Sequence, residues 1–244
     1  MKVKYLKEEE IEFASGRLLR AYEEKFDLKV GPPIPLDEIV ESLLGLDIRF
    51  DCLATLLRRS NVLGAIWIED KRIRIDDSLD PSITPSKTGR YRFTLAHEVG
   101  HWELHRSYFL ARSMQGGLFS QSDEPSVVCR AGDTEPIEWQ ANAFAAHLLM
   151  PKQMIFAAWE QLNGDLRPYN ATEEINYLSN RFSLGEERTL TVGCAGRMVQ
   201  RFQVSAQAMQ IRLTGVGLVQ LQKGSSELFD KWAGTGIFTS GGSN

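Results

Sequence analysis

The chain has 244 residues, a formal net charge of −4 and three cysteines. This charge balance provides no overall basic field for nucleic acid or anionic membranes, and three widely spaced cysteines without a C-x-x-C pair exclude a disulfide-rich scaffold and a cysteine-based zinc finger. No apolar run reaches the ~20 residues of a membrane span, and the first residues contain no apolar signal core, so we expect a cytoplasmic protein.

The first 80 residues predict two helices followed by a small sheet. Apolar side chains recur at steps of three and four over residues 6–26, which is the period of an amphipathic helix. A second, short helix is expected over 36–45, where a glycine ends it. Apolar and alternating residues over 46–51 and 64–76 predict strands, the second as a hairpin that turns at 69–71.

The rest of the chain is predicted to be mainly helical. One helix begins at Ser86 or Thr88 and ends near His105. Residues 107–135 contain glycines, prolines and a polar stretch, and they predict an irregular loop long enough to cover a site. Further helical patterns occupy 137–150, 152–162 and 172–181, with a pair of helices within 197–213.

These patterns predict an α+β protein in three parts. Residues 1–165 would form a domain with the sheet, 166–223 a helical subdomain, and 224–244 a flexible tail rich in glycine and serine. The last pair of helices resembles a helix-turn-helix, but Gln203 replaces the usual turn glycine and Arg212 has little further positive charge around it. We therefore expect no direct binding to nucleic acid, and a helical part that docks on the first domain or grips a protein substrate.

The segment RFTLAHEVGHWELHR contains three of the four histidines. His97 and His101 are four residues apart and Glu98 lies between them, which is the H-E-x-x-H spacing of zinc hydrolases. On a helix this spacing places both imidazoles on one face, and it places Glu98 about 100° further round, where its carboxylate can act as general base on a water polarised by the ion. A solvated polar face of an amphipathic helix is the structural alternative.

Zinc hydrolases need a third protein ligand. His105 is the nearest donor in the sequence, but eight residues of straight helix separate its backbone from that of His97 by ~12 Å, so both can bind one ion only if the helix bends. The metzincin pattern would require a glycine and a histidine where the chain has Leu104 and Ser107. A glutamate from the helix over 137–150 is the better option.

Two glutamates, Glu135 and Glu138, lie at the start of that helix. We prefer Glu138, because Asn142 follows one turn later and its amide could orient the carboxylate. The structural alternative is a favourable charge near a helix N-terminus without any metal. His147 lies about 180° round the helix from Glu138 and is expected to face away as a surface or structural histidine.

Other residues near the motifs have several possible roles. His105, Tyr108 and Tyr91 are the candidates for stabilising an oxyanion, although His105 may serve only a structural hydrogen bond. Cys129 is expected to be a buried structural thiol, with an inhibitory ligand of the metal as the alternative. Gly100 is expected to allow close packing against another helix.

The blocks TLAHEVGHWELH and IEWQANAFAAHLLMP together resemble the signature of the ImmA/IrrE family of zinc metallopeptidases. The resemblance implies one zinc ion held by His97, His101 and Glu138. It also implies that Glu98 is the catalytic base, on a gluzincin-like α+β scaffold. The family pattern often has an acidic residue where this chain has Gln140.

Family members are typically bacterial and cleave or antagonise helix-turn-helix transcriptional repressors. The resemblance therefore implies a regulatory zinc endopeptidase whose substrate is a DNA-binding repressor, in a stress response or a mobile element. A metal-stabilised protein that displaces a repressor without cleaving it is the alternative, but Glu98 favours the enzyme, since a structural zinc site needs no base. The apolar strand over 65–68 is a candidate to bind the substrate as an added strand.

Overall fold

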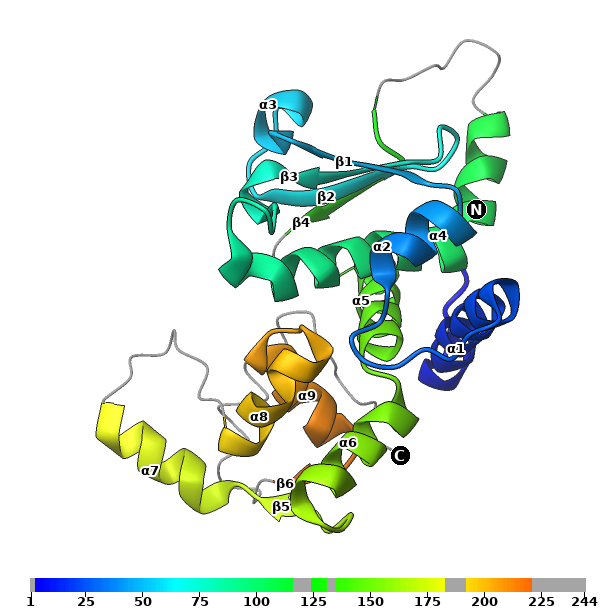
Figure 1. The fold of residues 1–244 in the computed structure, drawn as a ribbon. Coiled ribbons are helices and arrows are strands. Elements are labelled where there is room, and N and C mark those ends of the chain that lie inside the picture. The colour runs from blue at the N-terminus through cyan, green and yellow to red at the C-terminus, as the bar shows by residue number, and fades with distance from the viewer. Residues whose placement is uncertain (1–2, 116–123, 131–134, 183–191, 221–244) are drawn as a thin grey trace.

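A computed structural model describes residues 3–115, 124–130, 135–182 and 192–220 of the chain. The fold is mixed α+β, as predicted, and helix α4 (Thr88–Gln115) is its central element. One side of α4 packs against a four-stranded sheet, and helix α5 (Pro136–Leu149) crosses it on the other side (Figure 1). None of the helices described is long and apolar enough to cross a membrane.

The N-terminal helices cover α4 and α5. Helix α1 (Glu8–Phe26) buries its apolar face, including Ile11 and Tyr22, and packs mainly against α5. Helix α2 (Leu36–Glu38) continues without a break into a π-helical turn, η1 (Ile39–Leu43), so the predicted helix is present but its second half is wound more loosely.

The sheet has the strand order β1-β3-β2-β4, in which β1 and β3 are parallel and the other neighbours are antiparallel. In this order β2 lies inside the sheet, and Ala65 pairs with Arg74 of β3 and with Val128 of β4. The expectation that 65–68 is a free edge for a substrate is therefore wrong, because the chain itself supplies the neighbouring strand. The strands are β1 (Asp47–Asp51), β2 (Val62–Trp67), β3 (Arg72–Asp76) and β4 (Val127–Arg130).

Two segments differ from the prediction. Helix α4 continues ten residues beyond His105, because the first helix-breaking residues after the histidines are Gly116 and Gly117. The segment 107–135, predicted to be an irregular loop, contributes this last part of α4 and strand β4. The short elements are α3 (Leu53–Leu57) between β1 and β2, and η2 (Asp77–Leu79) and η3 (Pro85–Lys87) between β3 and α4.

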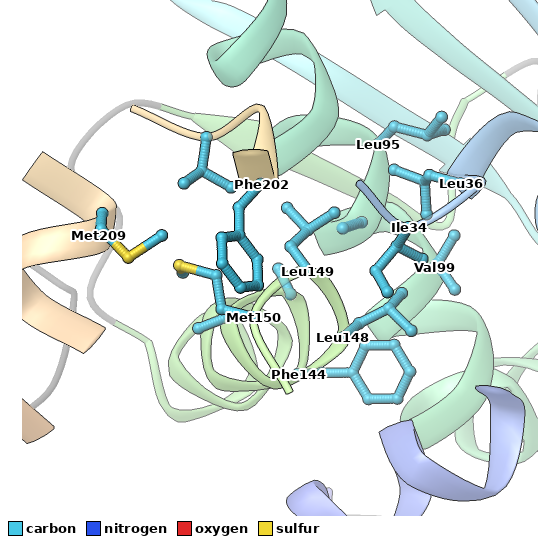
Figure 2. Close-up of a cluster of buried hydrophobic side chains, with 14 of the residues drawn as sticks. Ile34, Leu36, Leu95, Val99, Phe144, Leu148, Leu149, Met150, Phe202 and Met209 are labelled. Carbon is cyan, nitrogen blue, oxygen red and sulfur yellow. The ribbon is translucent and has the colours of Figure 1, made fainter. Parts of the chain in front are cut away.

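The C-terminal helices share the hydrophobic core of the rest of the protein. Phe202 and Met209 pack beside Leu149 and Met150 at the end of α5 (Figure 2). The division of the chain at residue 165 remains a prediction, and the tail 224–244 lies outside the described residues. The elements of this part are α6 (Lys152–Asn163), β5 (Tyr169–Asn170), α7 (Thr172–Phe182), α8 (Gly193–Phe202), α9 (Ala206–Gly215) and β6 (Val219–Gln220).

Helices α8 and α9 form the predicted helix-turn-helix-like pair. Gln203 in the turn has a φ of 51°, the left-handed conformation in which glycine is usually found. Arg212, the positive charge noted in the second helix, is buried, and its guanidinium contacts the Met150 carbonyl oxygen at 3.0 Å and His147 Nδ1 at 3.2 Å. This arginine therefore holds α9 on the end of α5, and His147 is a buried structural residue.

Candidate metal centre

The crossing of α4 and α5 creates the site. At the crossing Gly100 lies against Ala141, and a Cβ on Gly100 would be 3.0 Å from Ala141 Cα and 3.1 Å from its carbonyl oxygen. The absence of a side chain lets the two backbones approach, as predicted for Gly100. One helix therefore presents its histidines directly to the acidic first turn of the other.

The three residues predicted to bind the metal lie together at this crossing. His97 Nε2 is 3.0 Å from His101 Nε2 and 3.0 Å from Glu138 Oε2, and His101 Nε2 is 3.5 Å from Glu138 Oε1. All three side chains are buried. Glu135, the other candidate, is the exposed N-cap residue of α5, so only Glu138 is brought to the histidines.

A chain of hydrogen bonds determines which nitrogen of His101 has the lone pair. Gln140 donates from Nε2 to the Lys4 carbonyl oxygen at 3.3 Å, so its Oε1 faces His105 Nε2 at 3.5 Å as an acceptor. His105 therefore has its proton on Nε2, and its Nδ1 accepts from His101 Nδ1 at 3.2 Å. As a result His101 directs an unprotonated Nε2 at Glu138.

Asn142 orients the other histidine. Its Oδ1 lies 2.9 Å from His97 Nδ1, so Nδ1 donates a hydrogen bond to this oxygen. The other ring nitrogen, Nε2, directs its lone pair at the site. The prediction placed Asn142 on the carboxylate of Glu138. The structure instead directs the amide oxygen to His97, because α5 approaches α4 closely enough for an α5 side chain to reach the far edge of the imidazole.

The electrostatics of the cluster fit a cation. Burial opposes ionisation of Glu138, but the His101 and His97 side chains beside it outweigh burial and hold its pKa well below the usual value. Two imidazole lone pairs and this carboxylate therefore face one another in a buried space. Two histidines and a carboxylate are a common donor set of zinc hydrolases, so the residues fit a zinc ion.

Without a metal ion, a proton on His97 can supply the positive charge that the ionised Glu138 favours. Burial opposes its protonation, but the side chains of Cys129 and Glu138 outweigh burial and raise its pKa well above the usual value. Burial lowers the pKa of His101 to about 4. A metal ion would displace the proton from His97, as metal binding to histidine generally does.

Glu98 lies beside the cluster, with its carboxyl group against Gly64 of β2. Neither carboxylate oxygen has a hydrogen-bond partner among the residues that the structure describes, and the side chain is fully buried. Its Oε1 occupies the space of a missing side chain at Gly64 in β2, because a Cβ there would lie 2.6 Å from that oxygen. Burial raises the pKa of Glu98 to about 8, which suits a group that takes up and releases a proton near neutral pH.

The three candidates for an oxyanion stabiliser, His105, Tyr91 and Tyr108, have different surroundings in the structure. Both ring nitrogens of His105 are already bonded, to His101 and Gln140, which indicates a positioning role. The Tyr91 hydroxyl donates to Asp37 of α2, away from the histidines. Tyr108 stacks edge-on against its neighbour Phe109, and its role remains a prediction.

Cys129 is the one further donor beside the cluster that the sequence analysis had considered. Its Sγ, a ring nitrogen of His97 and a carboxylate oxygen of Glu98 all lie within 4.8 Å of one another. Burial raises the pKa of this thiol, and His97 opposes the increase. Neither Gly64 nor the role of Gln140 was predicted, and the sequence marked Gln140 only as a departure from the acidic residue that the family pattern often has there.

The family model of the IrrE N-terminal-like domain, a peptidase family designated M78, matches residues 65–214. The chain belongs to this family. The resemblance seen in the two motifs is thereby confirmed, and membership supports a regulatory, metallopeptidase-like role for the site on α4 and α5. The matched region begins in β2 and extends to α9, so it includes every residue of the buried cluster.

Comparison with solved structures gives a more distant similarity. The structure of a Mycobacterium tuberculosis transcriptional regulator has a TM-score of 0.43 and 17% sequence identity to this chain, over 84% of this chain and 46% of that chain. The chain thus spans about half the length of that protein. No curated protein matches the chain.

Proposed function

We propose that this chain is a zinc-dependent endopeptidase of regulatory type. In this proposal His97, His101 and Glu138 hold one zinc ion. The observation that supports it best is the convergence of these three buried donors, with both imidazole Nε2 atoms directed at the carboxylate. Membership in a peptidase family supports the same conclusion.

Glu98 is the proposed catalytic base. When bound, the zinc ion would polarise the scissile carbonyl and acidify a water molecule. Glu98 would take a proton from that water on one carboxylate oxygen and deliver it to the leaving amine. Its oxygens are suited to this work because no described residue uses them in a hydrogen bond and the buried site excludes competing solvent.

The proposed substrate is a helix-turn-helix transcriptional repressor. The resemblance of the two motifs to a family whose members typically act on such repressors supports this class, and the model of that family matches residues 65–214. The chain itself is not expected to bind DNA, because the arginine in the second helix of its helix-turn-helix-like pair is buried against α5. The proposed partner is a protein, and the proposed setting is the cytoplasm of a bacterium.

The test is to incubate the zinc-loaded protein with the repressor encoded beside its gene and to follow both cleavage and release of operator DNA. The wild type is compared with Glu98→Gln, which keeps the size of the side chain but removes the base. The matched control is Glu103→Gln, because Glu103 lies on the same helix and pairs with Arg17 and Arg106 instead of facing the cluster.

We expect cleavage by the wild type and by Glu103→Gln, and none by Glu98→Gln although that variant still binds zinc. Cleavage that persists in Glu98→Gln would rule out the proposed base. Release of the repressor from DNA without cleavage, in all three proteins, would instead establish the non-proteolytic anti-repressor.

A further inference from the structure

A cavity lies where the turn between α8 and α9 meets the first turn of α4. The two turns are in close contact, because a Cβ on Gly89 would lie 2.8 Å from Ser205 N and 2.8 Å from the carbonyl carbon of Val204. Thr88 and Gln203, on either side of this contact, line a cavity of about 500 Å³, a size typical of small-molecule sites. The described lining residues include none of the metal centre, so this cavity is a separate site.

Arg92 of α4 brings a positive charge to this cavity. The residue is only 6% exposed, and its Nη2 donates to the Ile34 carbonyl oxygen at 2.7 Å. Its Nε has no hydrogen-bond partner among the described residues, and none of them forms an ion pair with the guanidinium. A buried charge without a counterion is costly. The group therefore favours a ligand that supplies an anionic group, and a carboxylate matches the fork of a guanidinium.

Two carboxylates line the same cavity, those of Asp37 and Asp80. Asp37 Oδ1 accepts from the Tyr91 hydroxyl, and Asp80 Oδ1 accepts from the backbone N–H and the hydroxyl of Ser82. The second oxygen of each carboxylate remains for another donor. Neither aspartate forms an ion pair within the described part of the chain, so Asp37 and Arg92 border one cavity without pairing with each other.

This arrangement of charges selects the class of ligand. A purely anionic ligand would be repelled by the two aspartates, and a purely cationic one by Arg92. A ligand that carries a carboxylate and an ammonium group on neighbouring atoms would satisfy both. The rings of Phe50 and Tyr91, whose centroids are 5.4 Å apart, add an apolar wall to the cavity.

We propose that this cavity binds a free α-amino acid with an apolar or aromatic side chain. Its carboxylate pairs with Arg92, its ammonium group with Asp37 and Asp80, and its side chain packs on Phe50 and Tyr91. The ligand would contact α4 and the turn between α8 and α9 at once, so it should stabilise the docking of the C-terminal helical pair on α4. The inference goes beyond the proposed function and does not need the zinc ion.

The experiment is isothermal titration calorimetry of the full chain with L-phenylalanine and L-leucine. We expect at least one of them to bind with a Kd below about 1 mM. Two compounds test the charged contacts of the phenyl ligand: 3-phenylpropanoate lacks the ammonium group, and 2-phenylethylamine lacks the carboxylate. Each should bind at least about tenfold more weakly than L-phenylalanine, because each leaves one charged contact unmade.

Two variants test the residues. Asp37→Asn keeps an oxygen acceptor for the Tyr91 hydroxyl but removes the charge, and it should weaken binding of the amino acid by about tenfold. The matched control is Asp77→Asn, at an exposed aspartate outside the lining, which should bind as the wild type does. Arg92→Lys keeps the charge but loses the fork, and it should also bind more weakly; if this buried substitution prevents folding, Asp37→Asn decides.

Hydrogen exchange locates the site. The bound amino acid should slow exchange of the backbone amides in the turn over 203–205 and leave those of α1 unchanged. No binding of either amino acid, equal affinity for the three phenyl compounds, or protection that leaves this turn unchanged would overturn the inference. None of these results would affect the proposed metal centre, whose test is zinc binding and cleavage.

Discussion

Gly100 of α4 and Ala141 of α5 are in such close contact that a Cβ on the glycine would lie 3.0 Å from Ala141 Cα. This contact lies between the two histidines along α4 and one turn beyond Glu138 along α5. It therefore sets the distance between the helix that supplies the imidazoles and the helix that supplies the carboxylate. The geometry of the metal centre therefore depends on Gly100, which has no side chain.

Gly100→Ala should separate the two helices and weaken the metal centre. The new methyl group meets backbone atoms of Ala141 and the Cβ of Phe144, which cannot move independently of α5. We expect the free energy of unfolding to fall by about 1–3 kcal/mol, as for other overpacked cores. The measurement is urea unfolding, combined with competition against a chelator for zinc, which should show weaker binding.

The control for this substitution is Gly196→Ala in α8, where a Cβ would meet nothing within 4 Å. It should stabilise the protein by up to ~1 kcal/mol through helix propensity and leave zinc affinity unchanged. If Gly100→Ala behaved like Gly196→Ala, close approach of the helices would not be what positions the donors.

Gly64→Ala should affect catalysis without affecting metal binding. The added methyl group would occupy the space of Glu98 Oε1 and of Thr94 Cγ2, and the flexible carboxylate can swing away at little cost to the fold. A misplaced base costs roughly 100-fold in rate, so cleavage of the repressor should fall by about that factor. Gly31→Ala, at a position with open space, should cleave normally, and zinc stoichiometry should be the same in both variants.

Gln140→Leu should weaken zinc binding from outside the set of ligands. Without Oε1 as an acceptor, His105 is no longer held with its proton on Nε2, and the unprotonated state of His101 Nε2 is no longer enforced. Loss of such a partner costs about 10- to 100-fold in metal affinity. Gln140→Glu keeps an acceptor and should bind zinc close to the wild-type level, as should Gln161→Leu on the surface. Equal affinity of Gln140→Leu and the wild type would show that the hydrogen-bond chain is without effect.

Arg212→Ala should destabilise the protein as a whole. The guanidinium is buried and bonds to the Met150 carbonyl oxygen and His147, so the substitution leaves buried polar groups without partners. We expect a loss of about 1–3 kcal/mol in the free energy of unfolding. Arg201→Ala, which removes only an exposed contact with Gln161, should change it by less than about 0.5 kcal/mol. A neutral Arg212→Ala would mean that α9 is held to α5 by apolar packing alone.

The sequence could predict those features of the fold that depend on nearby residues. The helices α1, α5 and α9 follow from apolar residues at steps of three and four, and the β2–β3 hairpin from alternation on either side of a polar turn. Strand β4 could not be predicted in this way, because four residues after a polar stretch give little periodicity and their pairing with β2 is decided by contacts about 64 residues distant in the chain.

In the candidate site, too, features that depend on nearby residues could be predicted, whereas those that depend on distant contacts could not. The common face of His97 and His101 follows from helix geometry alone. Glu138 was preferred over Glu135 on its neighbours and on the resemblance to a family, and the structure brings it to the histidines. The partner of Asn142 could not be predicted correctly, because it depends on the crossing of α4 and α5 and hence on the contact at Gly100.

The most direct test of the proposed metal centre is a crystal structure of the zinc-loaded protein, with anomalous diffraction measured on both sides of the zinc absorption edge. We expect one anomalous peak per chain, at about 2.0–2.2 Å from His97 Nε2, His101 Nε2 and a Glu138 oxygen. A zinc peak bound elsewhere, or an α4–α5 crossing without a peak in protein that holds one equivalent of zinc, would contradict it.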